Sequence, residues 1–351
     1  MASQPPPPPE SIVLNQFSGL KNTVTPERLT GADLQRATNI DLDDSGQPRR
    51  RRGYTLKITG EWHSIFSDDA KVYGVKDGTL GIVRANYTFV PLTFVGNTPV
   101  AYVDVAGDIY FASRDVVGII AVDETLKQWG ALNGQGQWLS PVLTPTTTLG
   151  AVSGRLLGDP VNASYLALYN GRIYMAKGNI LWATELYQFN YIDRTRNFMQ
   201  FEGQITMLMA MTDGLFVGTD DGLYFIQGVL ESFKLNLISP AAVLPGSATW
   251  VSAEAVHPLN LTRPIPVEQA IVFMTTEGVL AGFDTGACYN LTYGRFEFPK
   301  GISAAALMRR DLGATSYVAT VDSGGSPAAA ARMGDYVSAE IIRFGGNSYG
   351  L

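Results

Sequence analysis

A two-part pattern recurs along most of this 351-residue chain and restricts its fold more than any other feature. A turn residue is followed by glycine, and a short run of alternating apolar residues comes next. Asn-Gly and Asp-Gly pairs favour tight hairpin turns, and alternation with period two is typical of a half-buried strand. The pattern therefore predicts antiparallel meanders. It occurs at residues 76–83, 106–113, 170–177, 213–219, 221–227 and 277–283.

The spacing of this pattern points to a repeated sheet. Gly78, Gly107, Gly171, Gly214 and Gly278 are separated by 29, 64, 43 and 64 residues, and the average of 50 is close to the period of a four-stranded propeller blade. We predict an all-β fold, a β-propeller-like array of antiparallel meanders with about five or six blades, preceded by an extended N-terminal arm and a short helix. A β-sandwich is the alternative, because hairpin signals alone do not fix closure.

The chain divides into three predicted parts. Residues 1–14 form a Pro-rich extended arm, because five consecutive prolines fix φ at about −65° and lack backbone donors. A solvated, disordered tail is the alternative for this stretch. Residues 15–60 form an N-terminal docking segment with a short helix and a hairpin. Residues 61–351 form the β-propeller-like body.

Local signals place the helix and the hairpin of the docking segment. Thr25 as N-cap and Pro26 at the first helical position predict a helix that continues to about Thr38. Residues 41–46, Asp-Leu-Asp-Asp-Ser-Gly, have the composition of a turn, in which Gly46 supplies a positive φ. A hairpin is expected to follow.

Four consecutive arginines, residues 49–52, follow this turn after two intervening residues. They could keep a solvated turn soluble, or their guanidinium forks could clamp carboxylates of a partner chain, or phosphates. Because the block lies on a loop of a segment without catalytic groups, we predict that it contacts a partner. The candidate interface residues of this segment are Arg49, Arg50, Arg51, Arg52, Phe17 and Tyr54.

A second candidate interface lies in the body. Its aromatic residues are too closely spaced for one sheet face, and two arginines follow them, a composition enriched at protein contacts. The alternative is a loop that covers the core. The candidates are Tyr187, Phe189, Tyr191, Arg194 and Arg196, with residues 309–311, Arg-Arg-Asp, as a weaker possibility.

The sequence offers few of the residues from which an enzymatic site is usually built. The chain contains only two histidines, His63 and His257, and one cysteine, Cys288, so a histidine-based triad, a disulfide within the chain and a cysteine-rich zinc site are not expected. Propeller glycosidases can work with paired carboxylates, for which Asp104, Asp220, Asp221 and Asp284 are available, although the Asp-Asp-Gly at 220–222 fits a hairpin turn better. We predict no enzyme, and no catalytic, cofactor or metal site.

Charge and hydropathy restrict the partners. The net charge of −6 and the pI of about 5.1 argue against wholesale binding to a nucleic-acid backbone, which requires a basic face. The N-terminus lacks the features of a signal peptide, and no apolar run of about 18 residues occurs. We therefore expect no membrane anchor.

The order of residues in the docking segment is itself recognisable. It runs Phe17-Ser-Gly-Leu-Lys-Asn-Thr, then Leu29, Gly31, Leu34, Ala37, Asn39-Ile-Asp-Leu-Asp, Gly46 and Arg51-Arg-Gly-Tyr54, and Gly-x-Ile-Tyr repeats follow. This series resembles the opening of the tail hub or nozzle proteins of tailed bacteriophages, the packaged-DNA-stabilisation proteins of short-tailed phages. The motif covers about 40 residues, and the repeats cover most of the rest.

The resemblance implies a structural protein of the virion tail, assembled in the cytoplasm of the bacterial host. Copies would form a ring, usually six-fold, below the portal and adaptor proteins, and the ring would retain the packaged genome and conduct it at ejection. Other partners would be tail components such as spikes, fibres or a needle, and double-stranded DNA passing non-specifically through the channel. An acidic channel suits this role, because strong basic contacts would hold the DNA duplex and prevent it from sliding. The alternative is a propeller that binds carbohydrate or protein, such as a receptor-binding virion protein, and a carboxylate-dependent glycosidase is less favoured.

Overall fold

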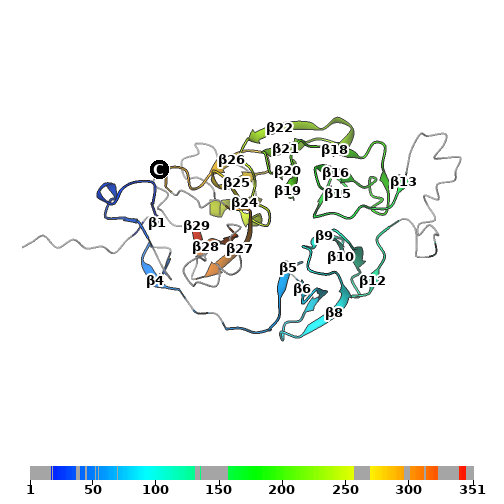
Figure 1. Cartoon of the computed structure of the whole chain (residues 1–351), viewed down its shortest axis with the longest axis horizontal. Coiled ribbons are helices and arrows are strands. Elements are labelled where there is room, and N and C mark those ends of the chain that lie inside the picture. Colours follow the sequence, from blue (N-terminus) through cyan, green and yellow to red (C-terminus); the bar gives the residue numbers. More distant parts are fainter. Residues whose placement is uncertain are drawn as a thin grey trace, which may run out of the picture.

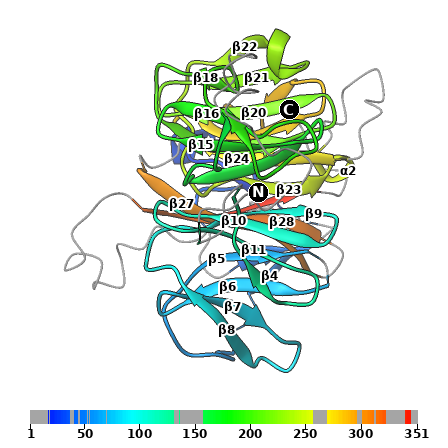
Figure 2. The same cartoon turned by 90° about the vertical axis from the view of Figure 1, so that its right-hand side faces the viewer.

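The structure is a computed structural model that describes residues 17, 19–36, 40–43, 46–51, 53, 55–68, 70–130, 135, 157–256, 269–295, 301–311, 314–322 and 340–344. Within these residues the body is a β-propeller-like array of six antiparallel sheets, five with four strands and one with three. The sheets follow one another around a centre (Figure 1). Figure 2 shows them face to face, from β5–β8 at the bottom to β19–β22 at the top. The predicted fold class is confirmed.

Each sheet is a meander of strands in sequence order, and only in the third sheet does a short strand of another pair, β17 (Ile192–Asp193), intervene. The first sheet contains β5 (Trp62–Ser67), β6 (Val72–Lys76), β7 (Thr79–Val83) and β8 (Phe89–Phe94). The second contains β9 (Ala101–Val105), β10 (Asp108–Ala112), β11 (Val117–Ile120) and β12 (Leu126–Lys127). The third contains β14 (Tyr165–Tyr169), β15 (Arg172–Lys177), β16 (Ile180–Ala183) and β18 (Phe198–Gln200).

The other three sheets repeat this arrangement. The fourth contains β19 (Ile205–Ala210), β20 (Gly214–Thr219), β21 (Leu223–Gln227) and β22 (Lys234–Ser239). The fifth contains β23 (Thr249–Ser252), β24 (Gln269–Thr275), β25 (Gly278–Phe283) and β26 (Cys288–Asn290). The sixth contains β27 (Ser303–Asp311), β28 (Ala314–Asp322) and β29 (Glu340–Phe344). Small elements between them are β13 (Leu157–Gly158), β17 (Ile192–Asp193), η3 (Leu230–Ser232) and α2 (Ala253–Val256).

The turn-Gly pattern marks hairpin turns at every place where it occurs. Between β14 and β15, Asn170 has φ of 46° and Gly171 has φ of 70°, the two positive values that a two-residue type I′ turn requires. The turns belong to different strand pairs, however, since Gly107 joins the first two strands of its sheet and Gly78 joins the second and third. This difference explains why the glycine spacing is irregular.

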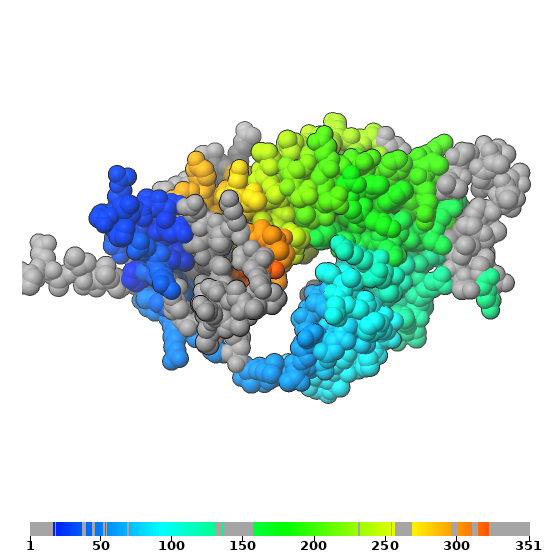
Figure 3. Space-filling view, viewed as in Figure 1, coloured from blue at the N-terminus to red at the C-terminus, as the bar shows by residue number. Residues whose placement is uncertain are grey.

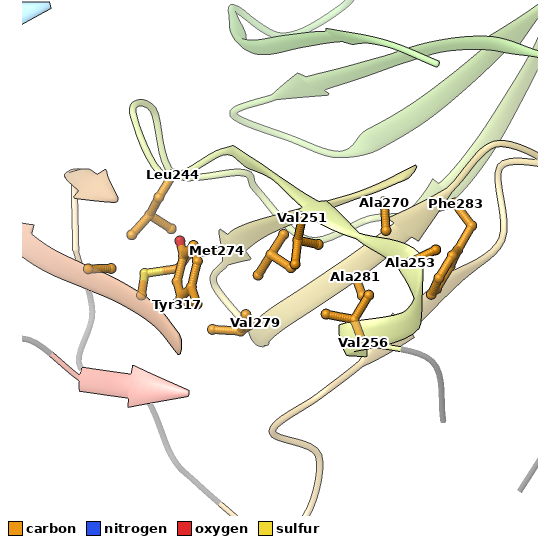
Figure 4. Close-up of a cluster of buried hydrophobic side chains, with 12 residues drawn as sticks. Leu244, Val251, Ala253, Val256, Ala270, Met274, Val279, Ala281, Phe283 and Tyr317 are labelled. Atoms are coloured by element: carbon orange, nitrogen blue, oxygen red, sulfur yellow. The ribbon is translucent and has the colours of Figure 1, made fainter. Parts of the chain in front are cut away.

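The core is divided into five clusters, and each fills one junction between consecutive sheets. Figure 4 shows the cluster between the fifth and sixth sheets, where Tyr317 of β28 lies against Met274 of β24 and near Leu244. The Tyr317 hydroxyl donates to the backbone carbonyl of Ser247 at 2.6 Å, so its polar end is satisfied inside an apolar junction. None of these five clusters joins the sixth sheet to the first. Figure 3 shows an opening between those two sheets.

Residues ahead of the body form a small N-terminal module, defined here as the described residues 17–51. It contains β1 (Gly19–Leu20) paired in parallel with β2 (Asp33–Leu34), the 3-10 helix η1 (Pro26–Arg28), and the antiparallel hairpin of β3 (Ile40–Leu42) and β4 (Pro48–Arg50). The predicted hairpin is confirmed, and Gly46 has φ of 79°. The predicted arm at residues 1–14 lies outside the described residues.

The predicted helix from Pro26 to about Thr38 is wrong beyond its first turn. The chain leaves the helix at Leu29, whose φ of −73° and ψ of 141° are extended, and Thr25 makes no side-chain cap. Asp33 instead accepts hydrogen bonds from the backbone and hydroxyl of Thr30, at 3.2 and 2.8 Å. This local side-chain bonding competes with a helix and directs the chain into β2.

Candidate docking surfaces

Two of the four arginines bind carboxylates of their own hairpin. Arg49 contacts Asp43 through Nε at 2.8 Å and Nη2 at 2.7 Å, and Arg51 Nε donates to Asp41 at 3.1 Å. Arg49 and Arg51 thus each bind an acidic side chain of their own hairpin, although the Arg49 side chain is 54% exposed, and their role in partner contacts stays a prediction. Arg50 points to the opposite side of β4 and is exposed. Arg52 and Tyr54 lie outside the described residues.

Two carboxylates, those of Asp41 and Asp33, fasten the module to the body. Arg309 of β27 donates to Asp41 at 2.8 Å, so Asp41 joins the hairpin to the sixth sheet, and both side chains are mostly buried. Arg295, which follows β26, contacts the buried carboxylate of Asp33 at 3.4 Å. Because these pairs are largely shielded from water, they hold the module more firmly than exposed ion pairs would.

Backbone and hydroxyl contacts extend this junction. The Asn22 amide donates to the Arg295 carbonyl at 3.0 Å, and the Thr23 hydroxyl donates to the Gly294 carbonyl at 2.8 Å. Tyr293, which directly precedes Gly294 and Arg295 in the sequence, is 85% exposed. Phe17 is half-buried inside the module, where its amide donates to the Gly46 carbonyl at 3.0 Å. The module is therefore a structured part of the chain with a large aromatic side chain exposed beside it.

The second predicted interface belongs to the third sheet and is only partly exposed. Tyr187 is 72% exposed and is held by a hydrogen bond from its amide to the Gly171 carbonyl at 2.7 Å. Phe189 instead packs against the core, and its carbonyl accepts the Trp129 indole N–H at 2.8 Å. Tyr191 is buried, so it is packed within its own chain and does not form part of the surface.

The arginines that follow this loop are exposed. Arg194 Nη2 donates to the Asp159 carbonyl at 3.2 Å, while Arg196 lies open to solvent. The exposed part of this candidate is therefore Tyr187 with Arg194 and Arg196. It lies on the third sheet, whereas the module contacts the sixth sheet and the segment after β26, so the two predicted interfaces form separate surfaces.

Some residues of these surfaces were missed by sequence reasoning. The role of Arg295 had no local signal, because its partner Asp33 is 262 residues away. Arg309 was recognised only as part of a weaker candidate. The outward leucines of β22, Leu235 and Leu237, alternate with polar residues in the sequence and could have been found by their period of two.

The carboxylates considered for catalysis serve turns. Asp104 accepts the Gly107 amide at 2.8 Å, and Asp220 accepts the Gln204 amide at 2.8 Å. Asp221 accepts the Thr219 hydroxyl within its own turn, and Asp284, after β25, accepts the amide of Thr212 from the turn between β19 and β20 at 3.2 Å.

Side chains that could bind a metal ion or act as a nucleophile are also scattered among the described residues. In the described part of the chain, no three His, Cys, Asp or Glu side chains are grouped so that they could hold a metal ion. His63 lies half-buried on β5, with Nδ1 at 3.0 Å from the Ser64 hydroxyl, and His257 lies outside the described residues. Burial raises the pKa of the Cys288 thiol to about 12, which makes it a poor nucleophile. No described helix is long and apolar enough to cross a membrane.

Comparison with known proteins finds similarity in fold only. No protein-family description and no curated protein matches the sequence. Among solved structures, the chain is similar to BBS1N in complex with ARL6DN, at 13% identity over 79% of this chain and 80% of that one, with a TM-score of 0.46. It is also similar to the N-terminal domain of Nup159 (9% identity, 75% and 74% covered, TM-score 0.44) and to the WD40 propeller of Doa1 (11%, 82% and 84%, 0.42). The fold assignment here depends on the strand pairing.

Proposed function

We propose that this protein is a structural subunit of a bacteriophage tail and assembles into a multimeric ring that retains packaged DNA and conducts it at ejection. The proposal begins from the resemblance of the N-terminal segment to tail hub and nozzle proteins. Two acidic residues of that motif, Asp41 and Asp43, hold the hairpin arginines, and Asp41 also joins the module to β27. The motif residues thus have a physical role in building a small module on a propeller-like body.

The observation that carries the proposal is the exposure of large apolar side chains, one beside the junction of the module with the body and one on the outer face of its hairpin. Tyr293 projects beside the residues that bind Asn22 and Thr23, and Ile40 is exposed on β3 next to Arg50 of β4. Aromatic and arginine side chains are enriched at protein interfaces, and exposed apolar groups are favoured there because association removes them from water. We define Tyr293, Ile40 and Arg50 as the module surface.

Ring formation is the direct test of the proposal. Mass photometry and negative-stain images of the purified full chain should show closed rings, with six copies expected from the resemblance. Tyr293→Ser should reduce the fraction of rings, whereas Tyr87→Ser, at an exposed tyrosine in the turn between β7 and β8, serves as the matched control. A protein that stays monomeric at every concentration and binds glycans would instead favour the carbohydrate-binding alternative.

A further inference from the structure

The rim strands of the propeller differ in how well their free edges are protected. An unpaired strand edge can accept a strand from another chain, and proteins block such edges with proline, charge or short length. β8 contains Pro91, whereas β12, β18 and β26 have only two or three residues each. β22 has six residues, no proline and one lysine at its start. Of the five rim strands whose side chains are described, β22 is the best template for strand addition.

The apolar side chains of β22 also favour the addition of a strand. Leu235 is 48% exposed and Leu237 is 59% exposed, and they lie opposite Ile226 and Tyr224 of β21 on one face of the sheet. Ile226 is fully buried in the junction between the third and fourth sheets. The two leucines therefore extend this buried junction outward to the rim. An added strand with apolar residues at alternate positions would cover them.

We propose that β22 accepts residues 11–16 of a second copy of this chain, Ser-Ile-Val-Leu-Asn-Gln. This segment matches β22 in length and contains three successive apolar residues, two of them β-branched, which favour a strand. With period two, Ile12 and Leu14 lie on one face and meet Leu235 and Leu237. On the opposite face, the apolar Val13 lies between the polar residues Ser11 and Asn15.

The position of the module favours a neighbouring copy over the same chain. Leu14 is three residue steps from Phe17, a reach of about 11 Å at full extension. Phe17 belongs to the module, which is fastened to β27 and to the segment after β26. The fifth sheet therefore lies between the module and β22 of the same chain (Figure 1). With so short a link to the module, residues 11–16 would reach a second molecule whose fourth sheet lies against the module.

This contact would be head-to-tail, because it joins different surfaces of two copies: the module of one and the fourth sheet of the next. Such heterologous contacts generate rings when the rotation closes. The inference therefore rests on the proposed ring and specifies its contact. It adds main-chain hydrogen bonds between subunits to the side-chain contacts of the module surface.

Cross-linking between two singly labelled copies tests the contact. Both proteins carry Cys288→Ser; one adds Leu14→Cys, and the other, with a different tag, adds Leu237→Cys. After mixing and oxidation, a disulfide between Cys at position 14 of one protein and Cys at position 237 of the differently tagged protein is expected. Peptide mass spectrometry maps it. Leu126→Cys is the matched control, because Leu126 is 46% exposed on the short rim strand β12. Circular dichroism verifies that each variant is folded.

The outcomes separate this contact from the ring itself. Rings without a Leu14–Leu237 cross-link above the control overturn the strand-addition inference and leave the proposed function standing. Absence of any oligomer contradicts both. A protein with both cysteines that forms the disulfide only within one chain also overturns the inference. Independently, Leu237→Lys should raise the concentration for half-assembly about tenfold, because it removes apolar contact from the edge, while Leu126→Lys should leave it unchanged.

Discussion

Replacing Asp41 by asparagine should loosen the N-terminal module while the propeller-like body stays folded. Asp41 accepts hydrogen bonds from Arg51 at 3.1 Å and from Arg309 at 2.8 Å, and all three side chains are mostly buried. Asparagine keeps the shape of the side chain but removes its charge. The substitution therefore weakens both ion pairs and leaves two guanidinium groups poorly compensated.

The size of this effect follows from the partial burial of the pairs. Hydrogen bonds to charged groups contribute about 1.5–3 kcal/mol, whereas exposed ion pairs contribute about 0.2–1 kcal/mol. Asp41 lies between these cases, and asparagine retains one acceptor. We expect a loss of about 2 kcal/mol in the free energy of opening the module. This loss corresponds to a roughly thirtyfold increase in the opening equilibrium.

Hydrogen exchange with mass spectrometry measures this change locally. Peptides that contain β3 and β4 should exchange roughly thirty times faster in Asp41→Asn, whereas peptides from β24 and β25 should be unchanged. Arg50→Gln is the control, since the Arg50 side chain is exposed. Arg309→Gln should have a similar local effect, and the double variant should be less damaging than the sum of the two. Unchanged exchange in the hairpin, or equal acceleration throughout the body, would refute the reasoning.

Four further substitutions or labels test other parts of the structure. Gly46→Ala should cost the module about 1–2 kcal/mol, measured by the same exchange, because φ is 79° and a Cβ would lie 2.9 Å from the Phe17 carbonyl oxygen. The hydrogen bond from Arg84 lowers the pKa of Glu124 to about 2. Since the folded pKa lies below the unfolded value of about 4.5, its stabilisation is present above pH 4.5 and is lost as the pH falls towards 2, so melting temperatures of Glu124→Gln and the parent should converge in acid. A thiol reagent at pH 8 should modify Cys288 slowly until denaturant exposes it, because burial raises its pKa to about 12. Phe273→Ala should reduce the unfolding free energy by about 3–5 kcal/mol in urea titrations, because the ring is fully buried.

The hairpin turns of the body could be predicted because their causes are local. Asn170-Gly171 combines two residues that tolerate positive φ with flanking residues of period two, and it forms the turn between β14 and β15. The number of sheets was less accessible. First strands begin at Trp62, Ala101, Tyr165, Ile205, Thr249 and Ser303, so their spacing varies from 39 to 64 residues. Loops of different length separate these starts, and no single period could reveal all of them.

The junctions of the module required information that distant residues supply. A helix start at Thr25 and Pro26 is a local signal, yet Asp33 draws Thr30 into a turn and itself meets Arg295. The favourable helix signal at the start is overruled by these contacts. The burial of Tyr191 could not be predicted either, because an aromatic side chain suits a protein interface and a core equally well.

The arginine block illustrates what a strand period adds to composition. In the β3–β4 pair Asp41 lies opposite Arg49, and the diagonal neighbours on that face are Asp43 and Arg51. Alternation therefore gathers two acids and two arginines on one face and leaves Arg50 on the other. Four consecutive arginines suggest a strongly basic patch, but those on the acidic face are neutralised within the hairpin. A partner that approaches the described outer face of this hairpin thus meets the single charge of Arg50 beside apolar Ile40, a combination that favours a protein contact over a phosphate clamp.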